Sequence, residues 1–153
     1  MTAIIIPRHY GYVIATTAST LFLSLWHSLR IGSFRKAAGI RYPQIYAESG
    51  DLANATGDKK QAMYLFNCAQ RAHGNFLENH GSVAIAILVA GLQYPIASSV
   101  MGVGWALSRV AYAVGYTRKD KEGGKGRLVG SPFWLFQLGL YSLTAWSGVR
   151  LLL

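Results

Sequence analysis

The amino-acid sequence predicts an all-α integral membrane protein, folded as an antiparallel bundle of four transmembrane helices. The composition is 52% hydrophobic and only 14% charged, whereas soluble domains have about 25% charged residues. Four segments each offer roughly 20 mainly apolar residues, the length that a bilayer demands of a helix. The chain of 153 residues has the length of one domain, so we expect a single membrane domain over residues 1–153.

The first predicted span covers residues 10–32. Its apolar run is longer than the hydrophobic region of a secretory signal peptide, and no convincing small-residue cleavage site follows it. We therefore interpret it as a retained span. Small residues in this span and in the third, such as Ala15 and Gly102, would let neighbouring helices approach closely.

The second predicted span, residues 64–92, changes character along its length. Its first half mixes polar with apolar residues, whereas the stretch 83–92 is purely apolar. We expect one long helix whose first half projects toward water and whose second half lies in lipid. The third span, residues 95–117, begins at Pro95, because proline is favoured in the first turn of a helix. The fourth span covers residues 132–153.

Much of the positive charge gathers in two connections between these spans, residues 30–41 and 118–127. The positive-inside rule assigns both connections to the cytosol and both termini to the opposite side. Basic clusters of this kind also contact anionic lipid headgroups. The net charge of +9 forms no long surface stripe, so we expect no nucleic-acid partner. On this topology the sequon Asn54-Ala55-Thr56 is cytosolic and unmodified.

A polar stripe lies in the second span, where Arg71, Asn75 and Glu78 fall at positions i, i+4 and i+7. This spacing places a cation, an amide and an anion on one face of a helix. Such a face suits a zwitterionic peptide, since arginine takes a carboxylate in a bidentate pair. The alternative is an ion pair that only fixes the bundle, but seven residues span about 10.5 Å of helix. The stripe therefore favours a ligand.

A second face is marked in the third span by Trp105, Arg109, Tyr112 and Tyr116, at i, i+4, i+7 and i+11. Tyrosines in such positions are also typical of the aromatic belt at a membrane interface. Arg109 does not fit that explanation, because an arginine in the middle of a membrane helix needs a partner or water. Tyrosine hydroxyls beside it would add hydrogen bonds for a polar ligand.

Other chemistries find weaker support. His73, Glu78 and His80 match neither the HExxH pattern nor a zinc-finger spacing, so we expect no metal. Cys68 is the single cysteine, which excludes an intrachain disulfide, and it is typical of a small buried apolar residue. The segment 120–127 lacks the P-loop pattern and is interpreted as a flexible basic turn.

Two segments carry a resemblance to a known family: F-N-C-A-Q-R-A-H-G-N-F-L-E at 66–78 and R-V-A-Y-A-V-G-Y at 109–116. Tyr42-Pro43, the Y-G-Y-V at 10–13 and the spacing of the spans extend it over essentially the whole chain. The sequence resembles the MAPEG family, the membrane-associated proteins of eicosanoid and glutathione metabolism. The resemblance implies a homotrimer of four-helix subunits, with glutathione bound between neighbouring subunits near the cytosolic side.

The resemblance also implies which side chains form the site. The expected glutathione-binding residues come from the first three spans and are Ser28, Arg35, Lys36, Arg71, His73, Asn75, Glu78, Tyr112 and Tyr116. Related enzymes stabilise the thiolate with an arginine after the third span, and here Arg127 is the expected catalytic residue, with Lys125 as its competitor. Two positions depart from relatives: Asn79 stands where several have an aromatic residue, and His73 where leukotriene-forming members have glutamine.

The function implied is a glutathione transferase or peroxidase, with leukotriene-C synthase activity as a related possibility. Its partners would be glutathione, membrane lipid, and a lipophilic electrophile or lipid hydroperoxide that arrives through the bilayer. We expect the endoplasmic reticulum, or alternatively the mitochondrial outer membrane, with the glutathione site facing the cytosol. The alternatives are a non-catalytic lipid-binding protein of the lipoxygenase-activating type and a small channel, although the lumenal halves of the spans offer few polar groups.

Overall fold

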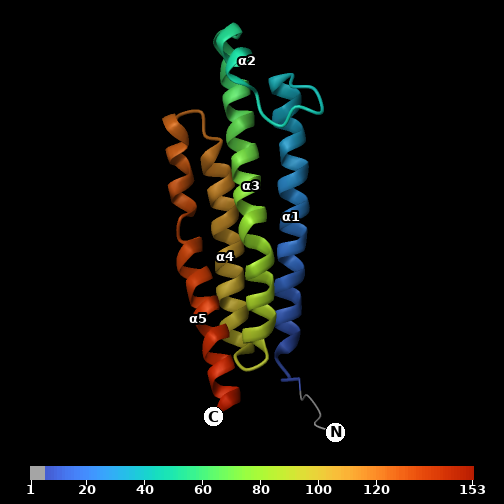
Figure 1. Ribbon diagram of the computed structural model, residues 1–153, viewed down its shortest axis with the longest axis vertical. Coiled ribbons are helices and arrows are strands. Elements are labelled where there is room, and N and C mark those ends of the chain that lie inside the picture. The colour runs from blue at the N-terminus through green and yellow to red at the C-terminus, as the bar shows by residue number, and fades with distance from the viewer. Residues whose placement is uncertain (1–5) are drawn as a thin grey trace. The chain divides into compact units, whose positions relative to one another are not determined.

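A computed structural model describes residues 6–153, and every regular element within that range is a helix (Figure 1). In chain order the elements are α1 (Tyr10–Ala38), α2 (Ser49–Asn54), α3 (Gly57–Gly91), α4 (Pro95–Tyr116), the 3₁₀ segment η1 (Glu122–Gly130) and α5 (Phe133–Leu152). The all-helical prediction is confirmed for the described residues. The first five residues of the predicted domain, 1–153, lie outside them.

The helix bounds agree with the predicted segments to within a few residues at most ends. α4 begins at Pro95 as expected. α3 begins at Gly57 rather than residue 64, and α1 continues to Ala38, well beyond residue 32. The connection interpreted as a flexible basic turn contains η1, in which Gly123 and Gly124 take φ of 59° and 64°. Glycine adopts such left-handed angles without steric cost.

No helix among residues 6–153 combines the length and the apolar character needed to cross a membrane. The four predicted spans, 10–32, 64–92, 95–117 and 132–153, are helical over most of their length, but the transmembrane part of the prediction is not borne out. Charged side chains lie within these helices, among them Arg30 in α1, Glu78 in α3 and Arg109 in α4.

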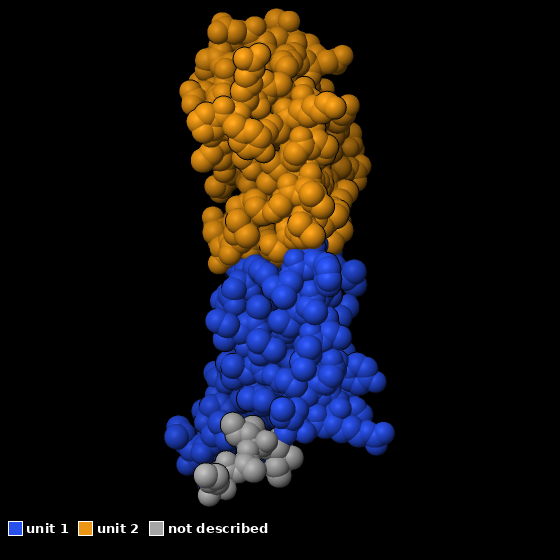
Figure 2. Space-filling view, turned by 90° about the vertical axis from the view of Figure 1, so that its right-hand side faces the viewer, with its two compact units in different colours: residues 1–23, 79–108, 132–153 blue, residues 24–78, 109–131 orange. Residues whose placement is uncertain are grey.

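The chain divides into two compact units, coloured separately in Figure 2. Unit 1 comprises the N-terminal residues up to Leu23 together with Asn79–Ser108 and Pro132–Leu153, and unit 2 comprises Ser24–Glu78 and Arg109–Ser131. The helices α1, α3 and α4 each contribute residues to both units. All ten residues expected in the functional site belong to unit 2.

Unit 1 is built on apolar packing at close range. Val13, Ile87 and Leu140, from α1, α3 and α5, are fully buried. A methyl group added at Gly104 of α4 would meet the Phe136 ring at 2.5 Å. Small residues therefore bring α4 and α5 together, as predicted for helices that pack closely.

Unit 2 fixes a long connecting segment against α3. The side chain of Asn67 donates to the Ala47 carbonyl (2.9 Å) and accepts from the Ala47 N–H (2.8 Å), and Gln70 donates to the Ile45 carbonyl (2.6 Å). Ala47 is buried with Met63 and with apolar residues at the end of α1. These bonds satisfy backbone groups that an unpaired loop would leave exposed.

Candidate functional site

The polar stripe predicted in the second span forms one face of α3. Arg71 and Glu78 are exposed, whereas Asn75 is half-buried between them. The Asn75 Nδ2 donates to Glu78 Oε2 at 3.3 Å. Arg71 and Glu78 interact electrostatically but make no direct ion pair within the described chain. This agrees with the axial separation expected for residues seven apart, and it leaves both charged ends facing outward.

Arg109 supplies the partner for this stripe from α4. The residue is fully buried (0% exposed), and its Nη1 donates to Asn75 Oδ1 at 2.9 Å. Its guanidinium carbon also lies 4.9 Å from the Tyr112 ring centroid, a cation–π contact. The Asn75 amide is thus held between Arg109 and Glu78, which fixes its orientation. The sequence indicated that Arg109 needs a partner or water, but Arg109 was not among the predicted site residues.

Two tyrosines continue the series along α4. Tyr112 and Tyr116 are one turn apart, with ring centroids separated by 5.6 Å and planes at 83°, an edge-to-face contact. Both are half-buried. Tyr116 also lies within the electrostatic reach of Arg71, so the two predicted faces on α3 and α4 come together in unit 2.

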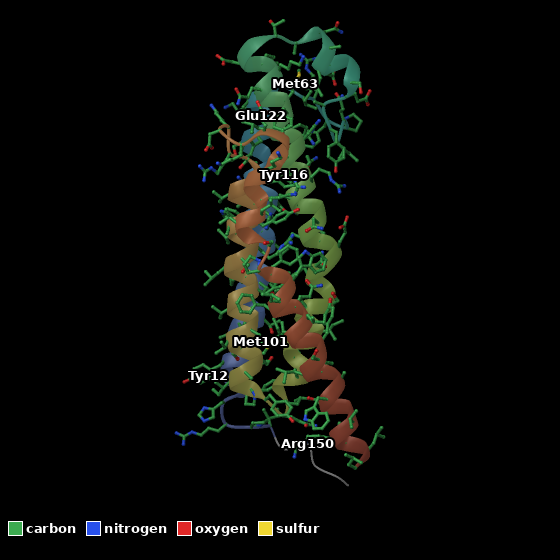
Figure 3. All side chains as sticks on the ribbon, turned by 90° about the vertical axis from the view of Figure 1, so that its left-hand side faces the viewer. Tyr12, Met63, Met101, Tyr116, Glu122 and Arg150 are labelled. Atoms are coloured by element: carbon green, nitrogen blue, oxygen red, sulfur yellow. The ribbon has the colours of Figure 1, made fainter. Side chains whose placement is uncertain are left out.

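Arg127 joins the series through the turn after α4. Its guanidinium lies 5.0 Å from the Tyr116 ring centroid, and its Nη1 donates to the carbonyls of Gly123 (3.1 Å) and Gly124 (3.0 Å). Gly124 has to be glycine, since its φ is positive and a Cβ there would collide with the Tyr116 ring. Figure 3 labels Tyr116 at the end of α4 and Glu122 at the start of η1.

A second constraint brings η1 close to α4. A Cβ at Gly115 would collide with the Gly126 carbonyl, and one at Gly126 would collide with the Gly115 carbonyl. The two backbones can approach only because both positions lack side chains. This backbone contact holds the residue before Arg127 against α4.

These contacts define a continuous series of side chains, which we call the α3–α4 series. Its members are Glu78, Asn75, Arg109, Tyr112, Tyr116 and Arg127. Five of the six were predicted from the sequence, and Arg71 approaches the series through its interactions with Glu78 and Tyr116.

Two predicted residues at the end of α1 have other surroundings. Arg35 is 8% exposed, and its Nη1 donates to the Gln44 carbonyl at 2.6 Å. Its guanidinium carbon lies 4.2 Å from the ring centroid of Tyr42 and 4.8 Å from that of Phe66. These contacts hold the connecting segment after α1. Lys36 is exposed and, with Arg35, lines a cavity of about 510 Å³.

Ser28 and His73 also make contacts outside the α3–α4 series. The exposed Ser28 hydroxyl donates to the Ser24 carbonyl of its own helix at 3.2 Å. The half-buried His73 ring lies 5.9 Å from the ring of His27, and its Nδ1 has no hydrogen-bond partner among residues 6–153. Both belong to unit 2, and the sequence offers no basis other than the family pattern for a role in the site.

Three further side chains border the series without having been predicted. Tyr46, in the connection before α2, interacts with Arg71 through its hydroxyl. The Tyr64 hydroxyl interacts with the buried thiol of Cys68, and this thiol also interacts electrostatically with Arg127. No helical periodicity pointed to Tyr46, because it lies in an irregular segment; Tyr64 and Cys68 are one turn apart on α3.

The rest of the turn carries one ion pair. Arg118 donates to Asp120 from Nε at 3.0 Å and from Nη2 at 2.6 Å. Through these bonds it holds the pKa of the Asp120 carboxyl below its ordinary value. Among residues 6–153, no group of three or more histidine, cysteine, aspartate or glutamate side chains could hold a metal ion.

The chemistry available is that of an anion-binding and zwitterion-binding surface. Arg71 and Arg127 offer guanidinium groups, and Glu78 offers a carboxylate. Tyr116 interacts with both arginines. Guanidinium groups bind carboxylates in a bidentate fork and stabilise thiolates by proximity. The arrangement therefore suits a small peptide with charges of both signs.

A sequence model of the MAPEG family matches residues 13–146. Proteins of this family are generally membrane proteins, and they include glutathione transferases, peroxidases and non-catalytic members. The match covers most of the chain and contains both the α3 stripe and the α4 tyrosines. The chain therefore belongs to the MAPEG family.

Proposed function

We propose that this protein is a membrane-bound glutathione transferase and peroxidase, which activates the glutathione thiolate for attack on a lipophilic electrophile or a lipid hydroperoxide. The observation that carries the proposal is the α3–α4 series, in which charged and aromatic side chains from α3, α4 and η1 meet in one unit. Membership of a family with glutathione-dependent enzymes supports the same function.

Glutathione carries two carboxylates and one ammonium group, so it needs cations and an anion at separate points. Arg71 would take a carboxylate in a bidentate pair, and Glu78 would take the ammonium. Asn75, whose amide Arg109 already orients, would hydrogen-bond the peptide between them. Both Arg71 and Glu78 are exposed, so a ligand can reach their charged groups.

The reactive sulfur would lie at the other end of the series, beside Arg127. A free thiol with a pKa of ~8.5 is mostly protonated at neutral pH, and the thiolate is the nucleophile. A cation beside the sulfur favours the thiolate. Lowering the thiol pKa by ~2 units requires roughly 2.7 kcal/mol, which one arginine can supply when water is partly excluded.

Conjugation then forms one sulfur–carbon bond. The thiolate attacks the electrophilic carbon, the leaving group departs with its electron pair, and the thiol proton goes to solvent. In peroxide reduction the thiolate attacks the terminal oxygen of the hydroperoxide, the oxygen–oxygen bond breaks, and the departing alkoxide takes a proton from solvent to leave as the alcohol. The sulfenic acid formed on sulfur then reacts with a second glutathione to give the disulfide and water.

The assembly and location that we propose rest on the resemblance of the sequence to microsomal glutathione S-transferase 3. They are a homotrimer with glutathione between neighbouring subunits, a location in the endoplasmic reticulum, and a site that faces the cytosol. Arg35 and Lys36, whose contacts lie elsewhere in unit 2, would then act on glutathione bound with a neighbouring subunit. Crosslinking of the purified protein tests the trimer.

A non-catalytic lipid-binding function is the second candidate. It is favoured by an apolar cavity of about 440 Å³ in unit 1, lined by residues that include Tyr12, Thr16, Ile96 and Val100. A cavity of this character suits an acyl chain. Lipid binding without affinity for glutathione would select this candidate over an enzyme.

The deciding experiment is a paired assay on the purified protein with glutathione and either a generic aryl halide or a fatty-acid hydroperoxide. Turnover of either substrate supports the proposal, and the ratio of the two rates says which reaction dominates. Calorimetric titration with glutathione alone accompanies the assay. The absence of binding at millimolar glutathione would exclude the enzyme and leave the lipid-binding candidate.

A further inference from the structure

The two cavities formed by the start of α3 and the turn after α4 share part of their lining. The first, of about 550 Å³, includes Asp58, Lys59, Gln61 and Lys119. The second, of about 520 Å³, includes Lys60, Gln61, Lys119, Lys121 and Glu122. Gln61 and Lys119 line both, so the cavities adjoin in unit 2.

The lining is unusually rich in lysine. Lys59, Lys60, Lys119 and Lys121 stand against the carboxylates of Asp58 and Glu122, which leaves a net charge of two positive. None of the four lysines forms an ion pair within the described part of the chain. Their charges are therefore not neutralised by the protein itself.

The neighbouring groups are already engaged. Arg118 and Asp120 form an ion pair with each other, and the Asp120 carboxylate interacts with Lys121 only at longer range. The Lys59 ammonium lies against Gly39 at the C-terminal end of α1, where the helix dipole favours a cation. Asp58 lies in the first turn of α3, where the dipole favours an anion. Lys60, Lys119 and Lys121 remain exposed.

We propose that these adjoining cavities form a binding site for a phosphate group, with Lys119 and Lys121 as its principal ligands. A phosphomonoester carries a charge of about −1.5 to −2 at neutral pH, which matches the net positive charge of the lining. Lysine binds phosphate as a point charge, and the Gln61 amide adds a donor that both cavities share. A single carboxylate would leave one positive charge unmatched.

The site is separate from the α3–α4 series in its ligands. The two sites adjoin at Gly123, which lines the second cavity and accepts a hydrogen bond from Arg127. Phosphate binding at these cavities requires no catalytic role for Arg127 and does not depend on glutathione. The phosphate could belong to a membrane lipid or to a small soluble molecule.

The test uses the full-length protein in detergent and three variants: Lys119→Gln, the double variant Lys119→Gln/Lys121→Gln, and Lys125→Gln as matched control. Lys125 lies in the same exposed turn but lines neither cavity. Binding of inorganic phosphate is followed by the phosphorus NMR line width. Adducts with phosphatidic acid, against phosphatidylcholine, are counted by native mass spectrometry.

We expect the double variant to lose roughly tenfold or more in affinity, since it removes two charge-assisted hydrogen bonds, and Lys125→Gln to bind like the wild type. Binding of phosphatidic acid alone would identify a lipid headgroup as the source, and binding of both probes a general phosphate site. The proposal is overturned if neither probe binds, or if Lys125→Gln reduces binding as much as the double variant.

Discussion

Each compact unit contains a network of polar side chains, and the two networks differ in kind. In unit 1 the network is neutral. Gln137 of α5 is 4% exposed; it donates to Asn79 Oδ1 and to the Tyr141 hydroxyl, both at 2.9 Å, and accepts from the Trp105 indole at 3.2 Å. The Tyr141 hydroxyl in turn lies 2.6 Å from Ser82 Oγ. Each amide and hydroxyl finds its partner within the unit.

In unit 2 the network is charged. The α3–α4 series contains two arginines and a carboxylate, and its ends at Glu78 and Arg127 are not fully buried. Burying charge costs far more than burying an amide, so a charged network needs a reason beyond packing. We infer that the neutral network specifies how α3, α4 and α5 pack, whereas the charged one serves a ligand.

The largest effect is expected from Arg127→Ala, which removes the cation at the proposed sulfur end of the series. We expect kcat to fall by roughly 100-fold, the scale of a lost electrostatic contact to a developing or reactive charge, with little change in glutathione affinity. Steady-state kinetics with an aryl halide measures both quantities. Arg118→Ala is the control, because Arg118 pairs with Asp120. A loss of glutathione affinity at constant kcat would mean that Arg127 binds glutathione rather than activating its thiol.

Arg71→Ala should have the reverse signature. Loss of the charge-assisted hydrogen bonding between the guanidinium and the carboxylate costs at least about 1.5–3 kcal/mol, so glutathione affinity should fall by roughly 10- to 100-fold while turnover at saturation is kept. Calorimetric titration measures the affinity. Arg71→Lys should lie in between, since it keeps the charge but loses the bidentate fork. Unchanged binding in Arg71→Ala would mean that the α3 stripe serves only the fold.

Gln137→Leu probes the neutral network of unit 1. It leaves the Trp105 N–H and the Asn79 oxygen without the bonds they now make to Gln137, so the free energy of unfolding should fall by about 2 kcal/mol. Glutathione affinity should not change. Thermal unfolding in detergent and a glutathione titration test the two halves of this prediction. Weakened glutathione binding without a loss of stability would contradict the division between the units.

Ser28→Ala should have the smallest effect. Its hydroxyl is exposed and donates to the Ser24 carbonyl one turn earlier, so we expect a change in glutathione affinity of roughly twofold at most, the range of surface substitutions. The same titration measures it. A tenfold loss would indicate that a glutathione molecule held with a neighbouring subunit reaches Ser28, as the family resemblance implies.

The helices themselves could be predicted because their signal is distributed over many residues. Long apolar segments located α1, α3, α4 and α5, and Pro95 located the start of α4. The short helix α2 could not be found this way. It depends on a local capping box between Glu48 and Asp51, and six residues carry no periodicity that can be measured.

In the candidate site, too, part could be predicted from the sequence and part could not. The spacing of Arg71, Asn75 and Glu78 placed them on one face of a helix, and Arg109 was recognised as a cation that needs a partner. That the partner is Asn75 depends on how α3 and α4 pack, which no spacing within one helix reveals. The turn that holds Arg127 depends on Gly115, Gly124 and Gly126 fitting against backbone and ring atoms across the turn, which no periodicity within a helix reveals.

The most direct test of the central claim is the ultraviolet difference spectrum of glutathione bound to the purified protein at neutral pH, since a thiolate absorbs where a thiol does not. We predict a thiolate band for the wild type, and binding without that band for Arg127→Ala. A wild-type protein that binds glutathione only as the thiol, or an Arg127→Ala variant with an undiminished band, would contradict the account.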